Sequence, residues 1–126
     1  MGRLNDRVAL ITGASRGIGA AVARRFAAEG AHVVAVARAT AGLEALDDAI
    51  RAAGGTATLV PLDLTDGPAI DRLGGALAER HGRLDVLVGN AAILGGLSPL
   101  GHYKPRVWDR VMEVNVGANW RLIRAC

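Results

Sequence analysis

The chain has 126 residues, 51% hydrophobic and 21% charged, a balance typical of one globular domain over residues 1–126 and not of a disordered protein. Its net charge of +3 is dispersed, with no basic run longer than Arg24-Arg25, so nucleic-acid binding is not expected. One cysteine excludes an internal disulfide, and three scattered histidines offer no metal-ligand spacing. No apolar stretch is long enough to span a membrane. We therefore expect a cytoplasmic protein without a metal site or a membrane anchor.

Strands and helices are expected to alternate from the first apolar run onward. The run at residues 7–12 predicts a buried strand, and apolar residues spaced four apart after it predict a helix that stops near Gly30. The run at 32–37 predicts a second strand, and the helix that follows is expected to end at Gly54-Gly55.

The second half of the chain continues this alternation. A third strand is expected at 56–63, followed by a helix closed by Gly82, and a fourth strand at 84–90. After a loop rich in glycine and proline, apolar residues spaced three and four apart from Val107 to Leu122 predict one long helix that continues to the last residue.

These elements together predict a doubly wound α/β fold, in which a parallel sheet carries helices on both faces. Each predicted strand is a nearly continuous apolar run, as burial on both faces of a sheet requires. In such folds ligands bind at the carboxyl ends of the strands, where the strand order reverses. The loop after the first strand is therefore the first place to look for a site.

That loop contains Gly13, Gly17 and Gly19 and leads directly into the first helix. Glycine lets the backbone turn tightly and approach a ligand, and a helix N-terminus attracts phosphate. We interpret the loop as a cradle for a diphosphate; the alternative is a turn that only needs positive φ. The glycine spacing matches neither G-x-G-x-x-G nor the phosphate-loop pattern G-x-x-x-x-G-K-[ST].

The end of the second strand bears on the choice of nucleotide. An acid there suits the ribose hydroxyls of NAD, whereas an arginine accommodates the 2′-phosphate of NADP. No Asp or Glu occurs between Gly30 and Leu43, while Arg38 follows the strand and Arg16 lies in the glycine loop. This pattern favours NADP(H) over NAD(H), although a solvated surface residue is the alternative interpretation of Arg38.

Four short segments occur in an order that resembles the short-chain dehydrogenase/reductase family. They are TGASRGIG at 12–19, DLT at 63–65, GNAA at 89–92 and EVNV at 113–116. The first is similar to the family's cofactor loop at every fixed position. GNAA departs from the family's N-N-A-G at Gly89 and Ala92, which puts in doubt only the geometry beside the nicotinamide.

The resemblance implies a Rossmann-like fold and hydride transfer between a nicotinamide and a small carbonyl or alcohol substrate. It also implies that Asp63 lies toward the adenine amine, with helix capping as the alternative, and that Asn115 belongs to the catalytic group. The residues expected to bind the cofactor are Gly13, Ser15, Arg16, Gly17, Ile18, Gly19, Arg38, Asp63, Leu64, Asn90, Ala91 and Ala92.

The family's proton-transfer motif, Tyr-x-x-x-Lys, does not occur in these residues. Tyr103 and Lys104 are the only tyrosine and lysine, and they are adjacent. Family members are roughly twice as long, so the chain is expected to be an N-terminal, cofactor-binding half that is inactive alone. The resemblance also makes the long helix a possible homo-oligomer interface, and a non-catalytic nucleotide-binding or interaction module is the alternative function.

Overall fold

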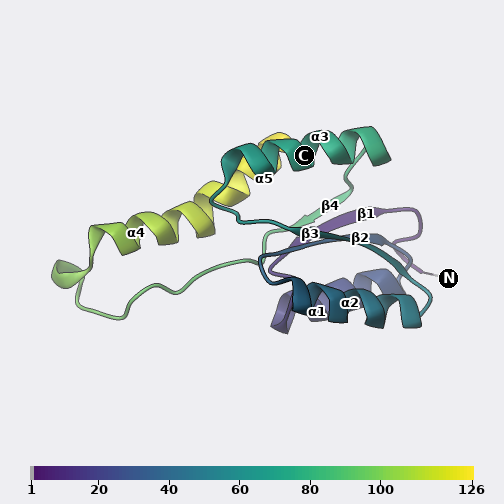
Figure 1. Cartoon of the computed structure of the whole chain (residues 1–126), viewed down its shortest axis with the longest axis horizontal. Coiled ribbons are helices and arrows are strands. Elements are labelled where there is room, and N and C mark those ends of the chain that lie inside the picture. Colours follow the sequence, from purple (N-terminus) through teal and green to yellow (C-terminus); the bar gives the residue numbers. More distant parts are fainter. Residues whose placement is uncertain (1) are drawn as a thin grey trace.

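A computed structural model describes residues 2–126 as a parallel sheet between two layers of helices (Figure 1). The strands are β1 (Val8–Thr12), β2 (His32–Ala37), β3 (Thr56–Pro61) and β4 (Val86–Val88). The α-helices are α1 (Gly17–Ala28), α2 (Thr40–Ala52), α3 (Gly67–His81), α4 (Pro105–Met112) and α5 (Ala118–Ala125). A 3-10 turn, Leu100–His102, precedes α4.

The sheet has the strand order β3-β2-β1-β4, and all three pairings are parallel. The central strand β1 is completely buried, since all five of its residues are shielded from solvent. β1 pairs with β2 on one side and with β4 on the other, so the order of the strands reverses beside β1. This is the position at which α/β sheets of this kind bind ligands.

Each face of the sheet has its own hydrophobic core. One core joins the sheet to α1 and α2 through buried residues such as Ala23, Leu43 and Ile50. The other joins it to α3 and α5 through Ile70, Leu77 and others. The predicted doubly wound α/β class is therefore confirmed.

Local sequence accounts for the ends of α3. The Asp66 side chain accepts a hydrogen bond from the backbone N–H of Ala69, and Pro68 occupies the first turn. Gly82 ends the helix in the left-handed conformation, at φ 73°. The capping role considered for Asp63 thus belongs to Asp66.

The predicted long helix is wrong in one respect. Residues 105–125 run on continuously, but the five residues Glu113–Gly117 form a π-helical turn between α4 and α5. A π turn is a single-turn bulge inside an α-helix, so apolar residues spaced three and four apart over several turns did not indicate it. α5 packs on α3, whereas α4 extends beyond the sheet and has no buried residue (Figure 1).

Two kinds of feature do not occur within residues 2–126. None of their helices combines the length and the apolar character needed to cross a bilayer. No three His, Cys, Asp or Glu side chains within this range come close enough together to hold a metal ion.

Candidate functional site

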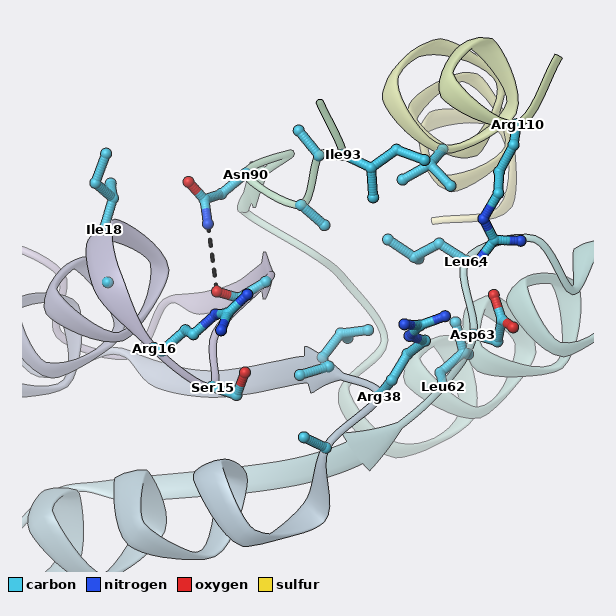
Figure 2. Close-up of a pocket in the computed structure, with 18 residues that line it drawn as sticks. Ser15, Arg16, Ile18, Arg38, Leu62, Asp63, Leu64, Asn90, Ile93 and Arg110 are labelled. Atoms are coloured by element: carbon cyan, nitrogen blue, oxygen red, sulfur yellow. Dashed lines mark hydrogen bonds between the residues drawn. The ribbon is translucent and has the colours of Figure 1, made fainter. Parts of the chain in front are cut away.

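A cavity of about 580 Å³ lies at the carboxyl ends of the strands (Figure 2). Eleven of the twelve residues predicted to bind a cofactor line it: Gly13, Ser15, Arg16, Gly17, Ile18, Arg38, Asp63, Leu64, Asn90, Ala91 and Ala92. Gly19 and Asn115 are not among the lining residues. The structure therefore brings together predicted residues from the four loops that follow β1 to β4, of which Gly13 and Ala92 are 79 positions apart in sequence.

The three glycines of the first loop have different structural roles. Gly13 and Gly17 lie in the left-handed region, at φ 63° and 59°. At Gly19 the constraint is space, because a Cβ would lie 2.1 Å from the carbonyl oxygen of Gly13. Positive φ thus accounts for Gly13 and Gly17. Close approach accounts for Gly19 and also applies at Gly13, where a Cβ would lie 2.9 Å from Asn90 Nδ2.

The N-terminus of α1 opens toward the cavity. Gly17 and Ile18 begin the helix and line the cavity, and Arg16 at the N-cap makes no side-chain capping hydrogen bond. A Cβ on Gly17 would meet nothing within 4 Å, so this backbone faces open space. Uncapped N–H groups and the positive end of a helix dipole form a site that suits a phosphate.

Thr12 joins the glycine loop to the loop after β4. Its side chain is fully buried, and its hydroxyl accepts hydrogen bonds from the backbone N–H groups of Asn90 and Ala91 at 3.0 and 2.9 Å. The same hydroxyl donates to the carbonyl of Val88. In return, the Asn90 side chain donates to the Gly13 carbonyl at 3.3 Å (Figure 2). These bonds fix the distance between the two loops that form one side of the cavity.

Charged side chains gather on the opposite side, where β2 and β3 end (Figure 2). Asp63 Oδ1 accepts from the backbone N–H and the hydroxyl of Thr65, at 2.9 and 2.8 Å. These two hydrogen bonds are the main reason why the pKa of Asp63 is lowered, and the positive charges of Arg38 and Arg110 add to the effect. Asp63 is therefore ionised at neutral pH.

Asn115 acts on the cavity indirectly. Its side chain makes two hydrogen bonds to the backbone of Ile93: Oδ1 accepts from the N–H at 2.8 Å, and Nδ2 donates to the carbonyl at 2.9 Å. Ile93 lines the cavity, so this pair ties the cavity wall to the π turn. The Asn119 side chain donates to the Asn115 carbonyl at 2.9 Å, and so supports the same turn. A catalytic role for Asn115 stays a prediction.

Tyr103 and Lys104 lie outside the cavity. The Tyr103 hydroxyl accepts a hydrogen bond from the N–H of Gly96 at 3.3 Å, in the loop before α4. Both residues line a separate, smaller depression.

Sequence reasoning missed seven residues that line the cavity. They are Val36, Ala37, Ala39, Leu62, Ile93, Arg110 and Val114. Most of them adjoin residues that were predicted, such as Arg38 or Asp63. Arg110 and Val114 come from the long helix, and the available signal was their spacing of four, which places them on one helix face.

Comparison with known proteins gives a consistent result. A family model for short chain dehydrogenases matches residues 7–126. Galactitol 2-dehydrogenase of Agrobacterium fabrum is 40% identical over 98% of this chain, and the match covers 46% of that relative. The chain thus spans about half the length of this curated relative.

Solved structures are similar over nearly the whole chain. A metagenomic short-chain oxidoreductase in complex with NADP is 44% identical with a TM-score of 0.93, over 97% of this chain and 55% of that one. Carveol dehydrogenase from Mycobacterium avium in complex with NAD is 26% identical with a TM-score of 0.92, over 99% of this chain and 50% of that one. The two similar structures therefore hold different nucleotides.

Proposed function

Because the chain belongs to the short-chain dehydrogenase family, we propose that it forms the cofactor-binding part of an NADP(H)-dependent oxidoreductase. The observation that supports this most directly is the cavity at the carboxyl ends of the strands. It combines an uncapped helix N-terminus with a glycine loop and an excess of positive charge. The nicotinamide cofactor, when bound, supplies or accepts a hydride, and the substrate is a small carbonyl compound or alcohol.

The protein's own groups fit the phosphates of a dinucleotide. Gly17 is exposed, lines the cavity and begins α1, so its N–H is one of the first-turn donors that have no acceptor within the helix. Gly13 and Gly19 let the loop and the helix approach each other closely, which holds that N–H beside the cavity. Ser15 and Arg16 complete this part of the lining.

The choice of NADP(H) rests on charge at the end of β2. Arg38 is exposed there and lines the cavity, and Arg16 lies in the facing loop. Asp63 is the single acid in the lining, and one of its oxygens already accepts two hydrogen bonds from Thr65. An arginine at this position suits a 2′-phosphate, and an acid would suit the free ribose hydroxyls of NAD.

We assign nucleotide binding, without substrate turnover, to residues 2–126 by themselves. Within this range no tyrosine or lysine lines the cavity, because Tyr103 and Lys104 lie in the loop before α4. A phenol has a pKa near 10 and needs a nearby positive charge to exchange a proton at neutral pH. The same observation favours the second candidate function, a nucleotide-binding module without chemistry.

The test is to titrate the protein with NADPH and NADH, following nucleotide fluorescence. Arg38→Asp is expected to weaken NADPH binding by about tenfold or more, because a charge-assisted hydrogen bond is lost. NADH binding should fall much less. Arg24→Asp is the matched control, since Arg24 is exposed on α1 and does not line the cavity.

Each outcome has a distinct meaning. An unchanged preference in Arg38→Asp would remove Arg38 from the site, and absence of binding by the unmodified protein would refute the proposed function. Oxidation of NADPH by residues 1–126 at an enzyme-like rate, with a panel of ketones and aldehydes, would refute the restriction to nucleotide binding.

A further inference from the structure

Arg110 reaches the cavity from a different part of the fold than the other cationic residues. It belongs to α4, and Figure 2 shows its side chain descending from the helix past Leu64 toward Asp63. Arg38 approaches the same carboxylate from the end of β2. The two guanidinium groups thus approach Asp63 from β2 and from α4, although the two arginines are 72 positions apart in sequence.

The position of Arg110 follows from the helix that carries it. Val114 lies one turn later, is buried, and also lines the cavity. Residues four apart share a helix face, and helical side chains lean toward the N-terminus. The burial of Val114 therefore turns this face of the helix toward the cavity, which Arg110 lines while it stays exposed to solvent.

The cavity has more positive charge than its own acid can balance. Seven arginines of residues 2–126 form ion pairs with carboxylates, but Arg16, Arg38 and Arg110 are not among them. These three line the cavity together with one carboxylate, that of Asp63. Since Asp63 is held by Thr65, it attracts the guanidinium groups without neutralising either by direct contact.

We propose that Arg110 is a specificity-determining residue of the nucleotide site, where it and Arg38 together bind the 2′-phosphate of NADP(H). This inference rests on the proposed function and extends it to α4. A phosphate that both guanidinium groups contact joins the long helix to β2 electrostatically. Binding of NADP(H) is then coupled to the position of α4, and binding of NAD(H) is not.

The variant Arg110→Gln tests this assignment, because it removes the charge and keeps a side chain of similar length. Arg106→Gln is the matched control: Arg106 is exposed one turn earlier on α4 and does not line the cavity. Binding of NADPH, NADH, 2′,5′-ADP and 5′-AMP is measured calorimetrically at low and high salt. The two adenosine fragments differ by the 2′-phosphate alone.

Arg110→Gln is expected to weaken NADPH and 2′,5′-ADP binding by about tenfold or more, and to reduce the salt dependence of both. NADH and 5′-AMP should bind as to the unmodified protein, and Arg106→Gln should change nothing. Arg38→Gln combined with Arg110→Gln should depart from additivity, since both residues contact one phosphate.

Two results would overturn the assignment. Equal losses for NADPH and NADH would place Arg110 against a part that both nucleotides share, and unchanged binding would place it outside the site. The proposed function would survive either result, provided that Arg38→Asp shifts the preference as expected. If the unmodified protein binds neither NADPH nor NADH, the proposed function and this inference both fail.

Discussion

Replacing Gly19 by alanine tests whether the glycine loop is held together by close packing. Gly19 lies inside α1, where alanine is intrinsically more stable than glycine by about 1 kcal/mol. The new Cβ, however, would lie 2.1 Å from the Gly13 oxygen and 2.6 Å from Asn90 Nδ2. The nearest of these atoms belongs to the backbone, so it cannot move aside as the end of a flexible side chain would.

The magnitude follows from these opposing effects. Overpacking of a close contact costs about 1 to 3 kcal/mol, and the upper end applies here because the loop itself must shift. After the gain in helix propensity is subtracted, Gly19→Ala should lower the free energy of unfolding by about 2 kcal/mol. It should also weaken NADPH binding, since the loop that moves lines the cavity.

Gly75→Ala is the matched control. Gly75 is a helical glycine in α3, and a Cβ there would meet nothing within 4 Å. This substitution should raise the free energy of unfolding by about 0.5 to 1 kcal/mol and leave nucleotide binding unchanged. Urea denaturation followed by circular dichroism measures both variants. If Gly19→Ala were as stable as Gly75→Ala, the packing argument for the loop would be refuted.

Three further predictions concern the contacts around the site and the amino-terminal end of β2. Thr12→Val should lower the free energy of unfolding by about 3 kcal/mol, because two backbone N–H groups lose their buried acceptor. Thr12→Ser keeps the hydroxyl and should retain most of the stability of the unmodified protein. Equal urea midpoints for Thr12→Val and Thr12→Ser would contradict this. Gly89→Ala should lower the free energy of unfolding, because a Cβ would lie 2.5 Å from Asn119 Oδ1. Adding Asn119→Ala should restore part of that stability. Strictly additive effects in this double-mutant cycle would show that the two residues are not coupled. The pKa of His32 is lowered by burial and by the nearby His81, Arg80 and Arg51, so the unfolded chain binds more protons than the folded chain between the lowered pKa and 6.5. The free energy of unfolding should therefore fall as pH drops through that window, by at most about 1.4 kcal/mol per pH unit. Urea midpoints from pH 7.5 to 5 should depend less on pH in His32→Gln, and an unchanged slope would exclude His32 as the source of the dependence.

The acidic side of the pH profile follows the same linkage rule in a lower pH window, because the pKa of a carboxyl group is lowered there. The pKa of Asp85 is lowered, chiefly because its carboxylate accepts a hydrogen bond from the N–H of Val8 at 2.8 Å, and Arg83 and Arg7 add positive charge nearby. A carboxyl group with a lowered pKa stabilises the folded state above its unfolded value, and that contribution is lost as pH falls through the folded value. Asp85→Asn should therefore reduce stability at pH 7 and reduce its decline between pH 5 and 3, which an acid titration of the urea midpoint measures.

Most of the sheet was predictable because its signals are local. β2 was predicted at its observed bounds, since the run HVVAVA at residues 32–37 is apolar after its first residue and is too short for a helix. β3 and β4 were predicted too long at their ends, by two residues and by four. The carboxyl ends of both strands lead into the cavity, whereas residues 84–85 precede β4 at the other end of the sheet. Hydrogen bonds to other strands, not side-chain type, decide where the pairing starts and stops.

Within the site, one arginine was predictable from local sequence and another was not. Arg38 was predicted because it follows a strand directly, so its place at the carboxyl end of the sheet is a consequence of chain order. Arg110 was not, because α4 reaches the cavity only through the packing of Val114 and α5 against the rest of the fold. The residues adjacent to Arg110 in sequence do not predict that packing.

The sequence by itself determined the α/β class, the glycine loop at the end of β1 and the family resemblance, because each depends on residues that are neighbours along the chain. The tertiary structure alone decided the bond between Thr12 and the loop after β4, the π turn that Asn115 and Asn119 support, and the approach of Arg110 to Asp63. Those features depend on the distance between segments that fold against each other from far apart in sequence, and local propensity contains no measure of that distance.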